Sequence, residues 1–178
     1  MKPIAPLAMV VAALVLLLTI TPSWGQPTCA APGCNPTVTD GNENTAGGTN
    51  ALVNVVTSGA SQGFNNTAFG FDALEDNTSG GNNTATGSGA LRLNTTGFEN
   101  TATGLNALGF NSTGYFNTAS GSSALASNDT GNSNTATGFG ALLNNTVGNN
   151  NTAVGFKALK KSLGTRTSAS GTRQASPS

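Results

Sequence analysis

The chain has 178 residues, of which only 8% are charged and 24 are glycine. Its formal net charge is zero, but all 7 acidic residues lie between Asp40 and Asp129, and most of the basic ones follow Lys157. This composition argues against an ordinary globular core. It also gives no basic surface for nucleic acid, because Arg92 is the only cation between Lys2 and Lys157.

Residues 1–25 have the pattern of a Sec signal peptide, and we expect cleavage before Gln26. An uncleaved membrane anchor is the alternative, although the apolar run is shorter than the ~20 residues of a spanning helix. In either case we expect the rest of the chain to be exported, to the extracellular space or to the cell surface. The pattern is carried by Lys2, the apolar stretch Ala8–Ile20, and the small residues Ser23 and Gly25.

Residues 26–43 form an N-terminal segment that contains both cysteines that the sequence has, Cys29 and Cys34. Pro32-Gly33 between them favours a tight turn. In an oxidising compartment we therefore expect a local disulfide. A metal site or a redox pair is the alternative, but the sequence has no histidine and the spacing is not CxxC.

Residues 44–161 form a repeat domain built from a 17-residue unit, NTAxGxxALxxNxxGxx. An irregular first unit begins at Asn44 and carries an insertion around Val53 to Gln62, so the domain has seven units. The regular units begin at Asn66, Asn83, Asn100, Asn117, Asn134 and Asn151.

Two glycines and two asparagines at fixed places in so short a unit exclude a helical repeat and predict an all-β, parallel β-solenoid of about seven coils. Each coil can hold two short strands and two turns, with Gly and Asn at positive φ and the Asn columns stacked as amide ladders. At ~4.8 Å per coil the rod is ~34 Å long. We expect packing from Leu74, Leu91, Leu108, Leu125, Leu142, Thr84, Thr101 and Thr135, and turns at Gly87, Gly104, Gly121 and Gly138.

The NTAxGxxAL units resemble the head repeats of trimeric autotransporter adhesins, the YadA-like heads, and also repeats of bacterial and phage fibre proteins. The resemblance covers residues 44–161. It implies a left-handed β-roll, a homotrimer, a location at the bacterial cell surface or outer membrane, and a binding or spacer role at a host matrix or polysaccharide surface. Two departures stand out: the 17-residue unit is longer than the family motif, and the apolar residue of the family's TAIG is kept only as Phe69 and Val154. The thin Leu-Ala seam of each unit also favours an oligomer.

A different class of function is raised by the Thr-x-Thr triplets that begin at Thr84, Thr101 and Thr135. Residues two apart on a strand share a face. If that face points outward, the triplets form a regular threonine array that resembles the ice-binding surfaces of β-solenoid antifreeze proteins. If threonine points inward, as the adhesin pattern implies, the array does not exist.

Residues 162–178 read as a disordered, basic, Ser/Thr-rich tail, which either contacts an acidic surface or is simply a solvated end. We expect no enzyme, no cofactor and no metal site. Acid–base catalysis needs positioned carboxylates or histidine, and the sequence clusters acidic residues in only one unit, at Asp72, Glu75 and Asp76. A nucleophilic Ser or Thr would need a base beside it, and the sequence suggests none.

Overall fold

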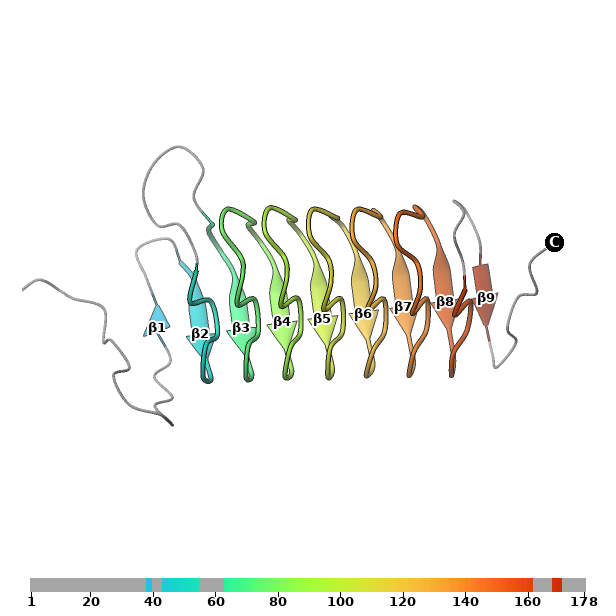
Figure 1. Ribbon diagram of the computed structural model, residues 1–178, viewed down its shortest axis with the longest axis horizontal. Coiled ribbons are helices and arrows are strands. Elements are labelled where there is room, and N and C mark those ends of the chain that lie inside the picture. Colours follow the sequence, from blue (N-terminus) through green and yellow to red (C-terminus); the bar gives the residue numbers. More distant parts are fainter. Residues whose placement is uncertain (1–37, 40–42, 55–62, 162–167, 171–178) are drawn as a thin grey trace, which may run out of the picture.

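The computed structural model describes residues 38–39, 43–54, 63–161 and 168–170, which form one nine-stranded sheet wound into a β-solenoid (Figure 1). The strands are neighbours in chain order, so each coil is stacked on the coil before it. No helix among the described residues is long and apolar enough to cross a membrane. The strands are β1 (Val38–Thr39), β2 (Thr45–Gly47), β3 (Thr67–Phe69), β4 (Thr84–Thr86), β5 (Thr101–Thr103), β6 (Thr118–Ser120), β7 (Thr135–Thr137), β8 (Thr152–Val154) and β9 (Ser168–Ser170).

Strands β2 to β8 each come from one repeat unit and pair in parallel with like residues in register. Ala68 pairs with Ala85, and Ala85 pairs with Ala102. The 22-residue first unit keeps the same register, since Ala46 pairs with Ala68. The predicted all-β solenoid with a repeat of about 17 residues is therefore confirmed.

Each described coil contains one three-residue strand, so the prediction of two strands per coil is wrong. The remainder of the unit is turn, because left-handed φ values of 66° at Gly89 and 51° at Leu91 break the extended conformation. Backbone hydrogen bonds still join the coils there. The Leu91 N–H donates to the carbonyl of Ala107 at 3.0 Å, and the Leu93 N–H donates to that of Gly109 at 3.1 Å.

The two ends of the sheet differ from the repeat. At the N-terminal end, β1 pairs antiparallel with β2, with Val38 opposite Ala46. At the C-terminal end, β9 pairs in parallel with β8. For the three residues of β9 the structure differs from the predicted disordered tail. Ser168-Ala169-Ser170 copies the Thr-Ala-x pattern of the strands, but it lies one residue short of the repeat spacing, which hid it in the sequence.

The core is made of two alanines and one leucine per unit. The strand alanine and the turn alanine of successive coils have essentially no exposed surface, and neither do the leucines predicted to pack there. Each buried leucine contributes ~1.5–3 kcal/mol. The confirmed leucine column consists of Leu74, Leu91, Leu108, Leu125 and Leu142.

Two columns of buried asparagines run the length of the rod, as the sequence predicted. In the first, the Asn100 Nδ2 donates to Asn83 Oδ1 at 3.2 Å and to the Gly114 carbonyl at 2.8 Å. In the second, the Asn94 Nδ2 donates to Asn77 Oδ1 at 2.8 Å and to the carbonyl of Gly97 at 2.9 Å. The ladders satisfy polar groups that would otherwise be costly to bury.

The two glycine columns have different physical causes. Gly104, like Gly87, Gly121 and Gly138, has a φ above 120° (132° at Gly104), and a Cβ there would lie 2.7 Å from the Gly121 carbonyl. The predicted glycine turns are thus confirmed for this column. Gly114 has no left-handed φ, but a Cβ there would lie 2.5 Å from the Gly131 carbonyl oxygen.

The ladder asparagines do not adopt positive φ, so that prediction is wrong for them. Their side chains are used inside the coil instead. Left-handed φ falls on the buried leucines, for example 50° at Leu108, because the turn must reverse direction there to point the leucine inward.

Candidate binding face

Threonine faces solvent along the sheet. In β4 to β8 the first and third residues of each strand are exposed and the central alanine is buried. The prediction that Thr84, Thr101 and Thr135 pack inside the rod is wrong, and the outward alternative holds. The physical reason is space, because leucines and asparagine ladders fill the interior and leave the strand room for a methyl group.

Two columns of side chains define what we call the threonine face. Like residues repeat every ~4.8 Å along the rod, and the two columns are ~6.6 Å apart, twice the rise per residue of a parallel strand. Neither column contains a charged residue. The first column is Thr45, Thr67, Thr84, Thr101, Thr118, Thr135 and Thr152. The second starts at Gly47, which is buried and adds no side chain, and continues with Phe69, Thr86, Thr103, Ser120, Thr137 and Val154.

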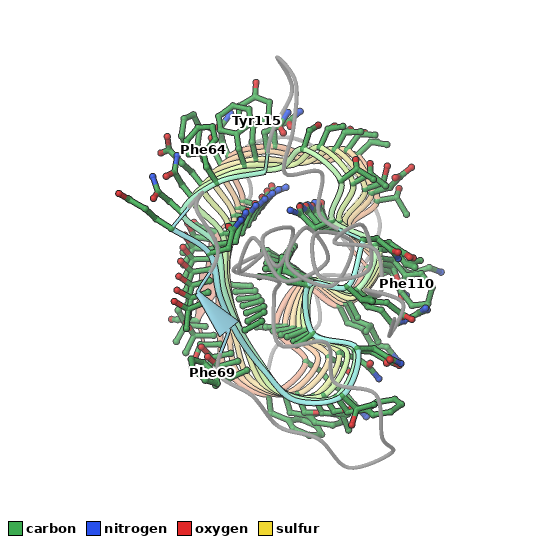
Figure 2. All side chains as sticks on the ribbon, turned by 90° about the vertical axis from the view of Figure 1, so that its left-hand side faces the viewer. Phe64, Phe69, Phe110 and Tyr115 are labelled. Atoms are coloured by element: carbon green, nitrogen blue, oxygen red, sulfur yellow. The ribbon has the colours of Figure 1, made fainter. Side chains whose placement is uncertain are left out.

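Figure 2 looks along the rod and shows like side chains of successive coils lined up one behind another. Phe69, which belongs to the second column, projects from one side of the cross-section, and Phe110 projects from the other. The threonine face is therefore one flank of the rod. The turn that carries Phe110 forms the opposite flank.

The first column is the same residue in all seven units, although burial does not require it. Other outward positions change from unit to unit. The position after the turn glycine, for instance, is occupied in order by Phe71, Ser88, Leu105, Ser122, Phe139 and Phe156. Core packing does not explain why this exposed position is threonine in every unit, whereas a contact surface would.

The threonine face is stiff. Threonine is β-branched, which restricts its χ1 angle, and its backbone is held by the ladder between coils. The Thr101 N–H, for example, donates to the Asn117 carbonyl at 2.8 Å, and the Thr118 N–H donates to that of Asn134 at the same distance. Each side chain offers one hydroxyl and one methyl group. The face can therefore make hydrogen bonds and apolar contacts at fixed intervals.

Sequence reasoning missed an exposed aromatic cluster on a loop between the two asparagine columns. Phe98 and Tyr115 stack with ring centroids 4.9 Å apart and planes 3° apart, and Phe116 packs edge-on against both. Phe98 and Tyr115 are one repeat apart in the sequence, which was the available signal. It was weak, because the equivalent position is Asn132 in the next unit.

Other predicted site residues lie outside the described part of the chain, namely residues 1–25 and the pair Cys29 and Cys34. Within the described part, no group of three or more His, Cys, Asp or Glu residues could hold a metal ion. No protein-family model, curated protein or solved structure matches the chain. The resemblance to adhesin heads therefore stays a prediction.

Proposed function

We propose that this protein is a non-catalytic binding rod whose threonine face binds ice. The observation that carries the proposal is the constant outward column, which is threonine in every unit from Thr45 to Thr152. An ice surface is an extended, uncharged lattice of regularly spaced oxygen atoms. An extended, uncharged lattice of hydroxyl and methyl groups is the matching surface.

The repeat supplies the spacing that such binding needs. Coils ~4.8 Å apart present successive threonines at one regular interval, as a crystal surface presents its oxygen atoms. Each contact is weak, but the backbone ladder fixes all of them before binding, so little conformational entropy is lost on contact. Phe69 and Val154 stand near the two ends of the second column, which leaves the central coils with Thr or Ser at every position.

The test is ice shaping and freezing-point depression by the purified chain without residues 1–25. Thr118→Tyr places a ring in the centre of the threonine face, and we expect it to abolish faceting of ice crystals. Thr113→Tyr is the matched control, because Thr113 is an exposed turn residue outside both columns. Unshaped, disc-like crystals from the wild-type chain, or equal activity in the two variants, would contradict the proposal.

The second candidate is an adhesin-like or spacer module at the bacterial surface, assembled as a homotrimer and binding host matrix or polysaccharide. It is favoured by large apolar side chains that the single chain leaves exposed, among them Phe71 at 55% and Phe110 at 53%. Light scattering on a sizing column tests it. A mass of three chains, with retention on matrix or polysaccharide arrays and without ice shaping, supports this candidate over the first.

Both candidates act outside the cell. The export signal proposed for residues 1–25 places the rod in the extracellular space or on the cell surface, where ice, matrix and polysaccharide occur. Fusion of residues 1–25 to a reporter enzyme that works only after export tests this step. Reporter activity that survives deletion of the apolar stretch Ala8–Ile20 would contradict it.

A further inference from the structure

Charged residues occupy the same three positions in two distant coils, with opposite signs. We number the coils by their repeat units, so that coil 2 begins at Asn66 and coil 7 at Asn151. Coil 2 carries Asp72, Glu75 and Asp76 in the turn around its buried leucine, and coil 7 carries Lys157, Lys160 and Lys161 in the equivalent turn. All six are half-buried or exposed. We call the flank formed by these turn positions the turn face. It has an acidic end and a basic end.

Equivalent turn positions of neighbouring coils lie side by side. The parallel register places Asn50 beside Asp72 and Asn54 beside Asp76, and their side-chain amides donate to those carboxylates at 2.9 Å and 3.2 Å. Glu75 stands beside Arg92 of the next coil, with 3.9 Å between the charged atoms. Like positions therefore form straight columns, and the two charged triads are five coil spacings apart, with four coils between them.

Between the charged ends the turn face is mostly uncharged and uneven. Coil 4 contributes Phe110, which is 53% exposed, beside Gly109, whereas coil 5 contributes the small residues Ala126 and Ser127 at the same positions. At the same two positions, coil 3 contributes Arg92 and Leu93, and coil 6 contributes Leu143 and Asn144. The turn face thus has the Phe110 ring protruding in one half and only the small residues Ala126 and Ser127 at the same positions in the other half.

From this complementarity we propose that two copies of the chain pair side by side and antiparallel through their turn faces. A two-fold axis between coils 4 and 5 brings the acidic end of each copy against the basic end of the other, twice over. The same axis sets the Phe110 ring of each copy over Ala126 and Ser127 of its partner. The exposed Phe110 ring in the mostly uncharged middle supplies apolar contact, and the charged ends fix direction.

This dimer does not depend on the proposed function. Figure 2 shows Phe110 on the opposite side of the cross-section from Phe69, so pairing through the turn face leaves both threonine faces open to solvent. A parallel homotrimer is a different arrangement, because it places like coils beside one another. If such a trimer packed through the turn face, acidic ends would meet acidic ends.

Two charge-reversal variants test the pairing by light scattering at low ionic strength. The acidic-end variant carries Glu75→Lys and Asp76→Lys, and the basic-end variant carries Lys160→Glu and Lys161→Glu. We expect the wild-type chain to have the mass of two chains and each variant alone to have the mass of one. An equimolar mixture of the two variants restores the mass of two, which also shows that both variants are folded.

The matched control reverses two exposed charges outside the turn face, Glu99→Lys and Asp129→Lys, and we expect it to keep the mass of two chains. A wild-type mass of one or three chains, or a ladder of larger masses, overturns the proposal. So does a variant mixture that stays monomeric while each variant gives the wild-type far-UV spectrum.

Zero-length carbodiimide cross-linking gives an independent readout. Within one chain, Lys160 and Glu75 are five coils apart, ~24 Å at the spacing of parallel strands, which is beyond the reach of a direct amide bond. A cross-linked peptide joining these two turns must therefore come from two chains. We expect it in the wild-type dimer, and its absence from a cross-linked species of two chains overturns the antiparallel arrangement.

Discussion

Replacement of Asn100 by aspartate tests the asparagine ladder with the smallest possible change of shape. The Asn100 side chain is fully buried and makes four hydrogen bonds. Its Nδ2 donates to Asn83 Oδ1 and to the Gly114 carbonyl, and its Oδ1 accepts from the backbone N–H and the Nδ2 of Asn117. Asn100→Asp keeps the acceptor and replaces the two donors by a second oxygen.

The cost follows from what that second oxygen meets. Two hydrogen bonds are lost, each worth about 0.5–1.5 kcal/mol net, and the new oxygen faces two other acceptors, Asn83 Oδ1 and the Gly114 carbonyl. A buried charge without a partner costs about 3–5 kcal/mol. At pH 7 we therefore expect the free energy of unfolding to fall by about 3–5 kcal/mol, a large part of a typical domain's stability.

The loss should depend on pH. Burial and neighbouring acceptors raise the pKa of the introduced carboxyl group in the folded chain above the ~3.9 of an unfolded aspartate. The folded variant then binds its proton more tightly than the unfolded one, so the variant loses stability as pH rises through about 4 toward the folded pKa. The protonated form can donate one hydrogen bond, which restores part of the ladder.

Urea unfolding followed by far-UV circular dichroism, at pH 4 and pH 7, measures the difference from the wild-type chain at each pH. Asn106→Asp is the matched control, because Asn106 lies in the same coil and is exposed; we expect it to change stability by less than about 0.5 kcal/mol. Equal losses for the two variants, or a loss for Asn100→Asp that does not grow between pH 4 and pH 7, would refute the role given to the ladder.

Three further substitutions probe the core, the turns and the aromatic cluster. Leu108→Asp puts a carboxylate in the closed core and should unfold the central coils. A far-UV spectrum and a melting temperature equal to those of the wild-type chain would contradict the solenoid fold. Gly104→Ala combines a φ of 132° with a backbone clash and should cost at least ~2 kcal/mol in urea unfolding, whereas an unchanged midpoint would contradict that turn geometry. Tyr115→Ser removes one half-buried ring from a stacked pair and should cost only ~1 kcal/mol, since aromatic pairs contribute ~0.5–1.5 kcal/mol; a loss as large as that of Gly104→Ala would show that the cluster is part of the core.

The architecture could be predicted from the sequence because the repeat fixes register. Equal spacing from Asn66 to Asn151 forces like residues to stack, and stacked asparagines and leucines can be satisfied together only inside a coil. The leucine column and the turn glycines followed from the same reasoning. The ladder hydrogen bonds, such as that between Asn94 and Asn77, followed as well.

The direction of the threonines could not be predicted, because alternation along a strand fixes which residues share a face but not which face is inside. Packing decides it: the strand alanines share one closed core with Leu91 and its equivalents, and a threonine there would overpack it. That each coil has a single strand could not be predicted either. The left-handed φ at the leucines follows from closing a narrow coil, and leucine has no intrinsic preference for that conformation.

The central claim, that the threonine face binds ice, is tested most directly by growing a single ice crystal in a solution of fluorescently labelled protein. Labels on Lys157, Lys160 and Lys161 sit on the turn face and leave the threonine face free. We predict that the wild-type chain and Thr113→Tyr are taken into the ice on defined crystal planes, while Thr118→Tyr is excluded. If ice grown with the folded wild-type chain contains no labelled protein, the claim is contradicted, and binding to matrix or polysaccharide surfaces is the candidate that remains.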